Sequence, residues 1–228
     1  MNIKNRLISL LYRMIALILG LYAITYDLGI MQGELKIYNL FYFTIISNIF
    51  CFGLFFALII KTIMDMKNEG IYGSSSVSPH IKGEITISII LTMSVYHFIL
   101  IPYALKQNPY QTLKFVDIVF HYLIPVLTVF DWILFDEKKR FKWYDPIAWV
   151  IGPTIYITFV YTQAGFRLLE KLNSHMNRYV YIFLDINKLG VQQVIGNILL
   201  LSTCFVIVGY MLYGIDRVKL NVGENKWT

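Results

Sequence analysis

Six stretches of mostly apolar residues, each long enough to cross a lipid bilayer, dominate this sequence. The hydrocarbon core of a bilayer is roughly 30 Å thick, so a helix needs about 20 apolar residues to span it. The stretches cover residues 7–26, 38–60, 85–105, 115–135, 146–162 and 194–213. We therefore expect an all-α fold, a polytopic bundle of six transmembrane helices that forms a single domain over residues 1–228.

The composition supports a membrane protein and argues against a nucleic-acid-binding protein. Hydrophobic residues make up 57% of the chain and charged residues 15%, whereas a soluble domain carries roughly 25% charged residues. One compact core cannot bury this excess, so lipid must be the solvent for much of the surface. The net charge of +6 is explained by basic residues that collect at the cytoplasmic ends of membrane spans. The first stretch, 7–26, exceeds the apolar region of a cleavable signal, so we expect it to remain as a span.

The distribution of lysine and arginine predicts the orientation of the spans. If the N-terminus is cytoplasmic, the cytoplasmic segments hold twelve lysines and arginines and the opposite segments hold seven, with Arg13 inside the first span left out. Cytoplasmic loops carry an excess of these residues in most membrane proteins. We therefore expect both termini on the cytoplasmic side.

Ionisable residues inside membrane spans are costly, and each one suggests a function. The candidates are Arg13, Asp27, His97, Asp117, His121 and Asp131. In the predicted topology the second and fourth spans enter from the same side, and Thr44 and His121 each lie six residues from the start of their span. At 1.5 Å per residue both side chains are about 9 Å below the outer boundary. We therefore expect Thr44 and His121 to meet in a pocket, with His97 near the same layer.

A threonine and a histidine at this spacing permit nucleophilic catalysis. A threonine hydroxyl attacks a carbonyl only when a neighbouring base takes its proton, and histidine is the usual base. Asp117 lies one turn before His121 and is predicted to orient the imidazole. Asn48 lies one turn after Thr44 and is predicted to donate a hydrogen bond to a developing oxyanion.

Structural roles for the same residues remain open alternatives. A threonine in a membrane helix commonly bonds to the carbonyl four residues earlier, and Ser47 and Asn48 are residue types that hold membrane helices together. His97 is a packing residue, a second pocket wall or a metal ligand. Because no cysteine or glutamate lies nearby at ligand spacing, we expect no metal. We also expect no cofactor.

Three segments carry a family resemblance. Residues 42–48 (YFTIISN), 121–132 (HYLIPVLTVFDW) and 179–185 (YVYIFLD) resemble signature segments of the androgen-induced/androgen-dependent TFPI-regulating family, and its bacterial branch is closest. The resemblance implies a six-span membrane hydrolase with a threonine nucleophile and a histidine partner, which are Thr44 and His121 in this chain. Animal members cleave fatty acid esters of hydroxy fatty acids. The pattern around Thr44 and the Asp131-Trp132 pair follow the bacterial branch, so the substrate is left open.

The leading hypothesis from the sequence is an integral membrane lipid hydrolase that cleaves a fatty-acyl ester. Its partners would be that ester and membrane lipids, and its location the plasma membrane of a bacterium. The alternative is a non-enzymatic lipid or small-molecule binder or transporter, in which His97, His121 and Asp117 form a polar cavity or a proton relay. Sequence alone leaves open the physiological substrate, the oligomeric state, the roles of Asp117 and His97, and whether residues 164–193 close over a pocket.

Overall fold

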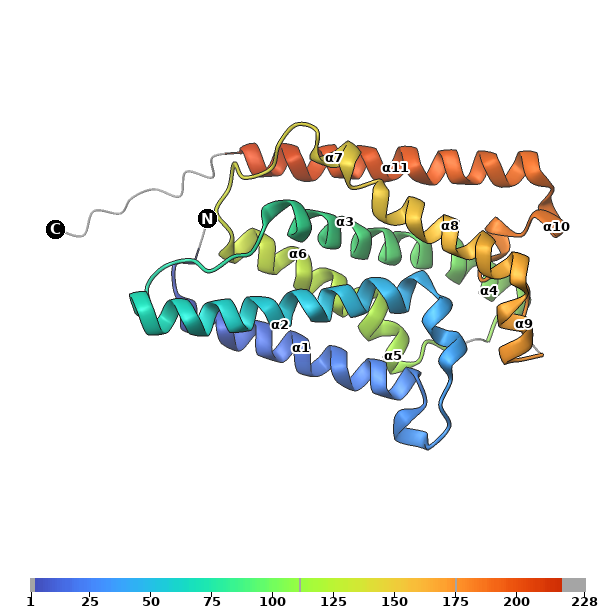
Figure 1. Cartoon of the computed structure of the whole chain (residues 1–228), viewed down its shortest axis with the longest axis horizontal. Helices are drawn as coiled ribbons and strands as arrows, with labels where there is room; N and C mark the ends of the chain where they lie inside the picture. The colour runs from blue at the N-terminus through green and yellow to red at the C-terminus, as the bar shows by residue number, and fades with distance from the viewer. Residues whose placement is uncertain (1–2, 111, 175, 219–228) are drawn as a thin grey trace.

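The computed structural model describes residues 3–110, 112–174 and 176–218, and helices form most of this part of the chain (Figure 1). Six helical segments are long and apolar enough to cross a membrane, which confirms the predicted six-helix all-α architecture. The segments are α1 (Arg6–Asp27); α2 (Phe43–Glu69); α3 (Pro79–Val95) with η3 (Tyr96–Leu100) and α4 (Ile101–Gln107); α5 (Phe115–Ile118) with η4 (Val119–Leu123) and α6 (Ile124–Phe135); α7 (Asp145–Ala148) with α8 (Ile151–Phe166); and α11 (Val191–Arg217). Shorter elements join them: η1 (Ile30–Gln32), η2 (Ile37–Phe41), α9 (Leu168–Leu172), η5 (Ile182–Leu184) and α10 (Ile186–Leu189).

The second span begins later than the sequence predicts. Residues 38–41 belong to the 3₁₀ turn η2, and Tyr42 has extended backbone angles (φ −78°, ψ 136°), so α2 starts at Phe43. Thr44 is therefore the second residue of a helix and not a residue one and a half turns inside it. The fourth span has the predicted bounds at both ends, and the third is longer than predicted because α3, η3 and α4 continue one another from Pro79 to Gln107.

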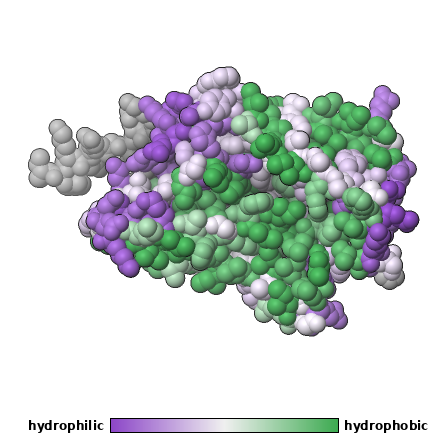
Figure 2. All heavy atoms as spheres, in the orientation of Figure 1, coloured by the Kyte–Doolittle hydropathy of each residue, from purple (hydrophilic) through white to green (hydrophobic). Residues whose placement is uncertain are grey.

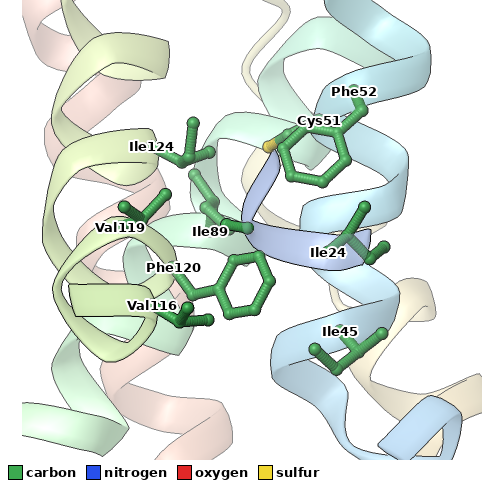
Figure 3. Close-up of a cluster of buried hydrophobic side chains, with 10 residues drawn as sticks. Ile24, Ile45, Cys51, Phe52, Ile89, Val116, Val119, Phe120 and Ile124 are labelled. Carbon is green, nitrogen blue, oxygen red and sulfur yellow. The ribbon is translucent and has the colours of Figure 1, made fainter. Parts of the chain in front are cut away.

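Helix α3 occupies the centre of the bundle. It contacts α2, α6, α8 and α11, while α1 packs on α2 and α6 (Figure 1). Figure 3 shows Val119, Phe120 and Ile124 directed toward Ile24 of α1 and Ile45 of α2, within a cluster of buried apolar side chains. Apolar side chains also cover the outer surface of the bundle, so hydrophobicity alone does not tell which residues are buried in the core.

Helices α1 and α2 approach each other closely at Gly20. A Cβ atom at this position would lie 2.1 Å from Cε1 of Phe52, so only glycine leaves room for the ring. Small residues allow this kind of close helix packing in membranes. The approach fixes the position of α2 relative to α1.

Apolar side chains cover the middle of the molecule, and polar residues gather toward the two ends of its long axis (Figure 2). Large apolar residues in this girdle are strongly exposed, including Ile15 (65%), Ile18 (64%) and Leu200 (64%). Water solvates such an apolar surface poorly, whereas lipid chains solvate it well. The surface therefore agrees with a protein that spans a membrane.

The two ends of the bundle differ in their connections. At one end, called the basic end, lie residues 70–78 and 136–144; at the other, called the η2 end, lie η2, α9 and α10 (Figure 1). The N–H of Ile3 donates to the carbonyl of Leu134 (2.7 Å), and Arg217 donates to the carbonyl of Phe141 (2.9 Å). Both ends of the described chain thus lie at the basic end. Lys219 and Lys226, which the orientation prediction counts, lie outside the described residues.

A buried ion-pair network lies toward the basic end. Asp131 pairs with Arg13 (2.8 Å) and with Lys82 (2.5 Å), and Lys82 also pairs with Asp136 (2.6 Å). The second arm of the Arg13 guanidinium donates to the hydroxyl of Thr62 (2.8 Å). The four charged side chains are at most 7% exposed and balance one another in charge. Arg13 and Asp131 therefore tie α1, α2, α3 and α6 together, and they do not reach Thr44.

Candidate functional site

Thr44 and His121 lie within hydrogen-bond reach, although 77 residues separate them. Oγ1 of Thr44 is 3.3 Å from Nε2 of His121. Thr44 is in the first turn of α2, and His121 is in η4, where it is 7% exposed. The predicted pairing therefore occurs in the structure, but at the N-terminus of α2 and not in the interior of the helix.

The hydrogen bonds of His121 define its tautomer. Nδ1 is 2.9 Å from the backbone carbonyl oxygen of Asp117. A carbonyl oxygen only accepts hydrogen bonds, so the hydrogen of the neutral ring lies on Nδ1 and donates to it. The lone pair of Nε2 then faces the hydroxyl of Thr44. This is the arrangement that a general base requires.

The predicted role of the Asp117 carboxylate is wrong. Its Oδ2 accepts a hydrogen bond from the backbone N–H of Lys114 (3.1 Å), at the start of α5. The group that orients His121 is the backbone carbonyl of the same residue. Sequence spacing placed Asp117 one turn from His121 correctly, but it could not distinguish the side chain from the main chain.

Tyr96 packs against one face of the His121 imidazole. Its ring stacks on His121 with centroids 3.5 Å apart and planes 9° from parallel. Tyr96 is the first residue of η3. Both η3 and η4 are π-helical turns, which are wider than α-helical turns, so two such turns on different helices face each other here. The imidazole is therefore held by a hydrogen bond in its plane and by an aromatic ring above it.

Both widened turns are explained by proline. In η4, Ile124 donates its N–H to the carbonyl of Val119, five residues earlier, and η3 has the same pattern. Pro125 and Pro102 each come one residue after this donor. Proline has no N–H and clashes with the carbonyl four residues earlier, which is that of His121 in the case of Pro125. A π-helical turn accommodates the missing bond, and we attribute the position of His121 to it.

Asn48 and Ser47 hold helices together. Nδ2 of Asn48 donates to the carbonyls of Thr44 (2.8 Å) and Phe120 (3.4 Å), and the residue is 0% exposed. Both of its N–H groups are used, so the predicted oxyanion role is wrong. Ser47 bonds to the carbonyl of Thr44 (3.1 Å) and to the hydroxyl of Thr92 (2.8 Å). The alternative of packing roles is confirmed for both residues.

His97 does not join the site. It is exposed on the outside of the bundle, and its Nδ1 is 3.0 Å from the hydroxyl of Tyr122. It lines neither of the cavities that reach Thr44. Over the part of the chain that the structure describes, no three histidine, cysteine, aspartate or glutamate residues form a group that could hold a metal ion.

Two cavities of different character meet at Thr44. The larger, which we call the vestibule, has a volume of about 460 Å³ and opens at the η2 end. Its lining includes Asp27, Asp117, Asp185, Lys188, Tyr96 and His121. The smaller, which we call the apolar cavity, has a volume of about 70 Å³ and lies between α3, α8 and α11, where Leu91, Ile157, Ile198, Leu201 and Phe205 line it. Thr44 therefore lies between a polar and an apolar compartment.

The connection between α8 and α11 forms part of both cavities. Tyr179, Tyr181 and Leu184 from this connection are buried at 7% exposure or less and pack on Tyr156 and Val160 of α8. Tyr181 lines both cavities, and its hydroxyl contacts the side chain of Thr44. Burial raises the pKa of Tyr181 to about 12, so it keeps its proton at neutral pH. Sequence reasoning used residues 179–185 only as a family pattern and missed Tyr181 as a site residue.

The function has to be inferred from this geometry. Comparisons with protein-family models, with curated proteins and with solved structures find no match for this chain. What the site offers chemically is a hydroxyl, an imidazole lone pair directed at it, and an apolar cavity beside a polar one. These are the parts that acyl transfer from an amphiphilic ester needs.

Proposed function

We propose that this protein is an integral membrane esterase that cleaves a fatty-acyl ester, with Thr44 as nucleophile and His121 as general base. The observation that carries the proposal is the 3.3 Å separation between Oγ1 of Thr44 and Nε2 of His121, with the hydrogen of His121 held on Nδ1. Catalytic hydrogen bonds in free enzymes are often longer than in the substrate complex. The 3.3 Å separation is slightly longer than the range of about 2.6–3.2 Å for a nucleophile and its base, and it is compatible with a hydrogen bond that shortens when the ester binds.

The proposed reaction has two half-reactions. Oγ1 of Thr44 attacks the ester carbonyl carbon while Nε2 of His121 takes the hydroxyl proton. The tetrahedral intermediate then collapses, the alcohol leaves with the proton returned by His121, and an acyl-threonine ester remains. In the second half, His121 takes a proton from water, the resulting hydroxide attacks the acyl-threonine, and the fatty acid is released as the proton returns to Thr44.

The two cavities suggest how the ester would bind. The apolar lining of the cavity between α3, α8 and α11 suits the acyl chain, although its volume of about 70 Å³ holds only the first few carbons, and the vestibule suits the polar part of the alcohol. Fatty acid esters of hydroxy fatty acids are members of this substrate class, and the family resemblance points to them. The excess of lysine and arginine supports a bacterial plasma membrane orientation in which the basic end is cytoplasmic and the vestibule opens outward.

A long-chain alkyl fluorophosphonate tests the proposal. It should form a covalent adduct with wild-type protein, and mass spectrometry of the digested adduct should locate the phosphonate on Thr44. Adduct formation only at other residues would overturn the assignment of the nucleophile. If liposomes with the protein show substrate flux that depends on His121 but is unchanged in Thr44→Ala, the transporter alternative is correct instead.

We expect His121→Ala to slow both ester hydrolysis and fluorophosphonate labelling by about 10²- to 10⁴-fold, the usual contribution of a general base. His97→Ala is the matched control, because His97 is also an intramembrane histidine but lies outside the cavities. Its rates should stay within about threefold of wild type, since surface substitutions away from a site have small effects. Equal losses in the two variants would show that His121 acts through stability and not as a base.

A further inference from the structure

The negative charge that develops on the ester oxygen needs hydrogen-bond donors. In acyl transfer these donors must lie 2.7–3.1 Å from the place where the oxyanion forms. Asn48 cannot supply one, because both of its N–H groups are used and it is not among the residues that line the two cavities. The donors must therefore come from another part of the wall beside Thr44.

The hydroxyl of Tyr181 lies at that wall. It contacts the hydroxyl of Thr44 and the backbone N–H groups of Thr44 and Phe43, at the N-terminus of α2. The N–H of Phe43 is used by the hydroxyl of Tyr156 (3.2 Å). The N–H of Thr44 is in the first turn of the helix, which has no carbonyl partner within the helix, and it makes no hydrogen bond to a carbonyl elsewhere in the described part of the chain.

The ring of Tyr181 is held rigidly. It stacks on Phe183 (centroids 5.1 Å apart, planes 13° apart) and meets Tyr42 and Tyr156 edge to face, at 5.8 and 6.4 Å. The residue is 7% exposed and still lines both cavities. A donor held in place before the reaction costs little reorganisation when charge develops.

We propose that the hydroxyl of Tyr181 and the backbone N–H of Thr44 form the oxyanion hole of this site, which makes Tyr181 a catalytic residue. The inference rests on the proposed esterase function. As Oγ1 of Thr44 bonds to the carbonyl carbon, the π electron pair moves to the carbonyl oxygen, and this oxygen accepts hydrogen bonds from Tyr181 and from the N–H of Thr44. When the intermediate collapses, the pair re-forms the carbonyl, and the C–O bond to the alcohol breaks. Tyr181 donates throughout and keeps its proton.

Tyr181→Phe tests this role, because it removes only the hydroxyl and keeps the ring contacts. For hydrolysis of a medium-chain p-nitrophenyl ester in detergent micelles, we expect kcat to fall by about 10²-fold, as for loss of one oxyanion donor, with KM changed less than about threefold. Dividing by the number of sites that fluorophosphonate titrates corrects for any protein that does not fold. Tyr161→Phe is the matched control: the hydroxyl of Tyr161 donates to the carbonyl of Leu184 (3.1 Å) in the same connection, and Tyr161 lines neither cavity.

A reversible inhibitor separates catalysis from packing. An alkyl trifluoromethyl ketone adds to the nucleophile and forms an oxyanion, so its affinity for Tyr181→Phe should weaken by about the same factor as kcat. A merely structural role of Tyr181 would raise KM and leave the affinity of the ketone unchanged, which would overturn the inference. Full activity in Tyr181→Phe together with an inactive Thr44→Ala would also overturn it, while the proposed function would stand. Full activity in Thr44→Ala would overturn the proposed function itself.

Discussion

Thr44→Ala is expected to lower kcat/KM for ester hydrolysis by roughly 10⁴-fold or more, as removal of the nucleophile does in serine hydrolases. The methyl group of alanine cannot attack the carbonyl, and water has no comparable position next to His121. Thr44→Ser should keep measurable activity because it retains the hydroxyl 3.3 Å from the imidazole. The measurement is initial rates for a p-nitrophenyl ester, with protein quantified by size-exclusion chromatography in detergent.

Ser47→Ala is the matched control for this prediction. Ser47 lies one turn further along α2, but its hydroxyl is used by Thr44 O and by Thr92 and is buried. Its loss should change activity by less than about tenfold, in line with the cost of one buried hydrogen bond.

The effects of substituting residues that act as a unit are non-additive, so His121→Ala added to Thr44→Ala should cause little further loss. A double variant much worse than Thr44→Ala would contradict a shared step.

Asp131→Ala is expected to lower the free energy of unfolding by about 3–5 kcal/mol, the usual cost of breaking a buried ion pair. Asp131 is the partner of both Arg13 and Lys82, which are 0% exposed. Without it, the guanidinium of Arg13 keeps the hydroxyl of Thr62 and the ring of Phe135 (5.6 Å to its centroid), and Lys82 keeps Asp136. Unfolding by sodium dodecyl sulfate in mixed micelles, followed by circular dichroism, measures the loss.

Glu137→Gln is the control for the ion-pair prediction. Glu137 pairs with Arg140 at 3.2 Å, but both side chains are more than half exposed. Exposed pairs contribute little because water and salt screen them, so we expect a change within about 0.5 kcal/mol. A similar effect of the two substitutions would show that the Asp131 network does not carry the stability that its burial implies.

Esterase activity of any Asp131→Ala protein that stays folded should be retained, since Asp131 follows His121 by ten residues, roughly 15 Å along a helix.

The membrane architecture was largely readable from the sequence. The six apolar stretches correspond to the six spans, and the fourth has the predicted bounds because Lys114 and Asp136 flank a run that is mostly apolar and whose ionisable residues are Asp117, His121 and Asp131. The prediction failed at Tyr38, where apolar and aromatic residues continue upstream of α2 without forming part of the helix. Apolar composition marks what lipid can solvate, but it does not mark where a helix begins.

The pairing of Thr44 with His121 was predicted with a depth argument that was partly wrong. Thr44 lies in the first turn of α2, whereas His121 lies six residues into its span, so the two residues are not equally far from the starts of their helices. They meet because the widened turn before Pro125 positions the imidazole, which stacks against Tyr96. The prolines were visible in the sequence, and their effect on the helix could have been argued from it.

By itself, the sequence determined that this chain forms six apolar helices and that few polar residues lie among them, because the exclusion of charge from lipid acts on each span separately. Only the tertiary structure decided what each polar residue does. It showed that the side chains of Asn48 and Ser47 form hydrogen bonds within and between helices and that the main chain of Asp117 orients His121. It also brought Tyr181 to Thr44 from 137 residues away. Hydrogen-bond partners depend on rotamers and on contacts between distant segments, which the local pattern of residues does not encode.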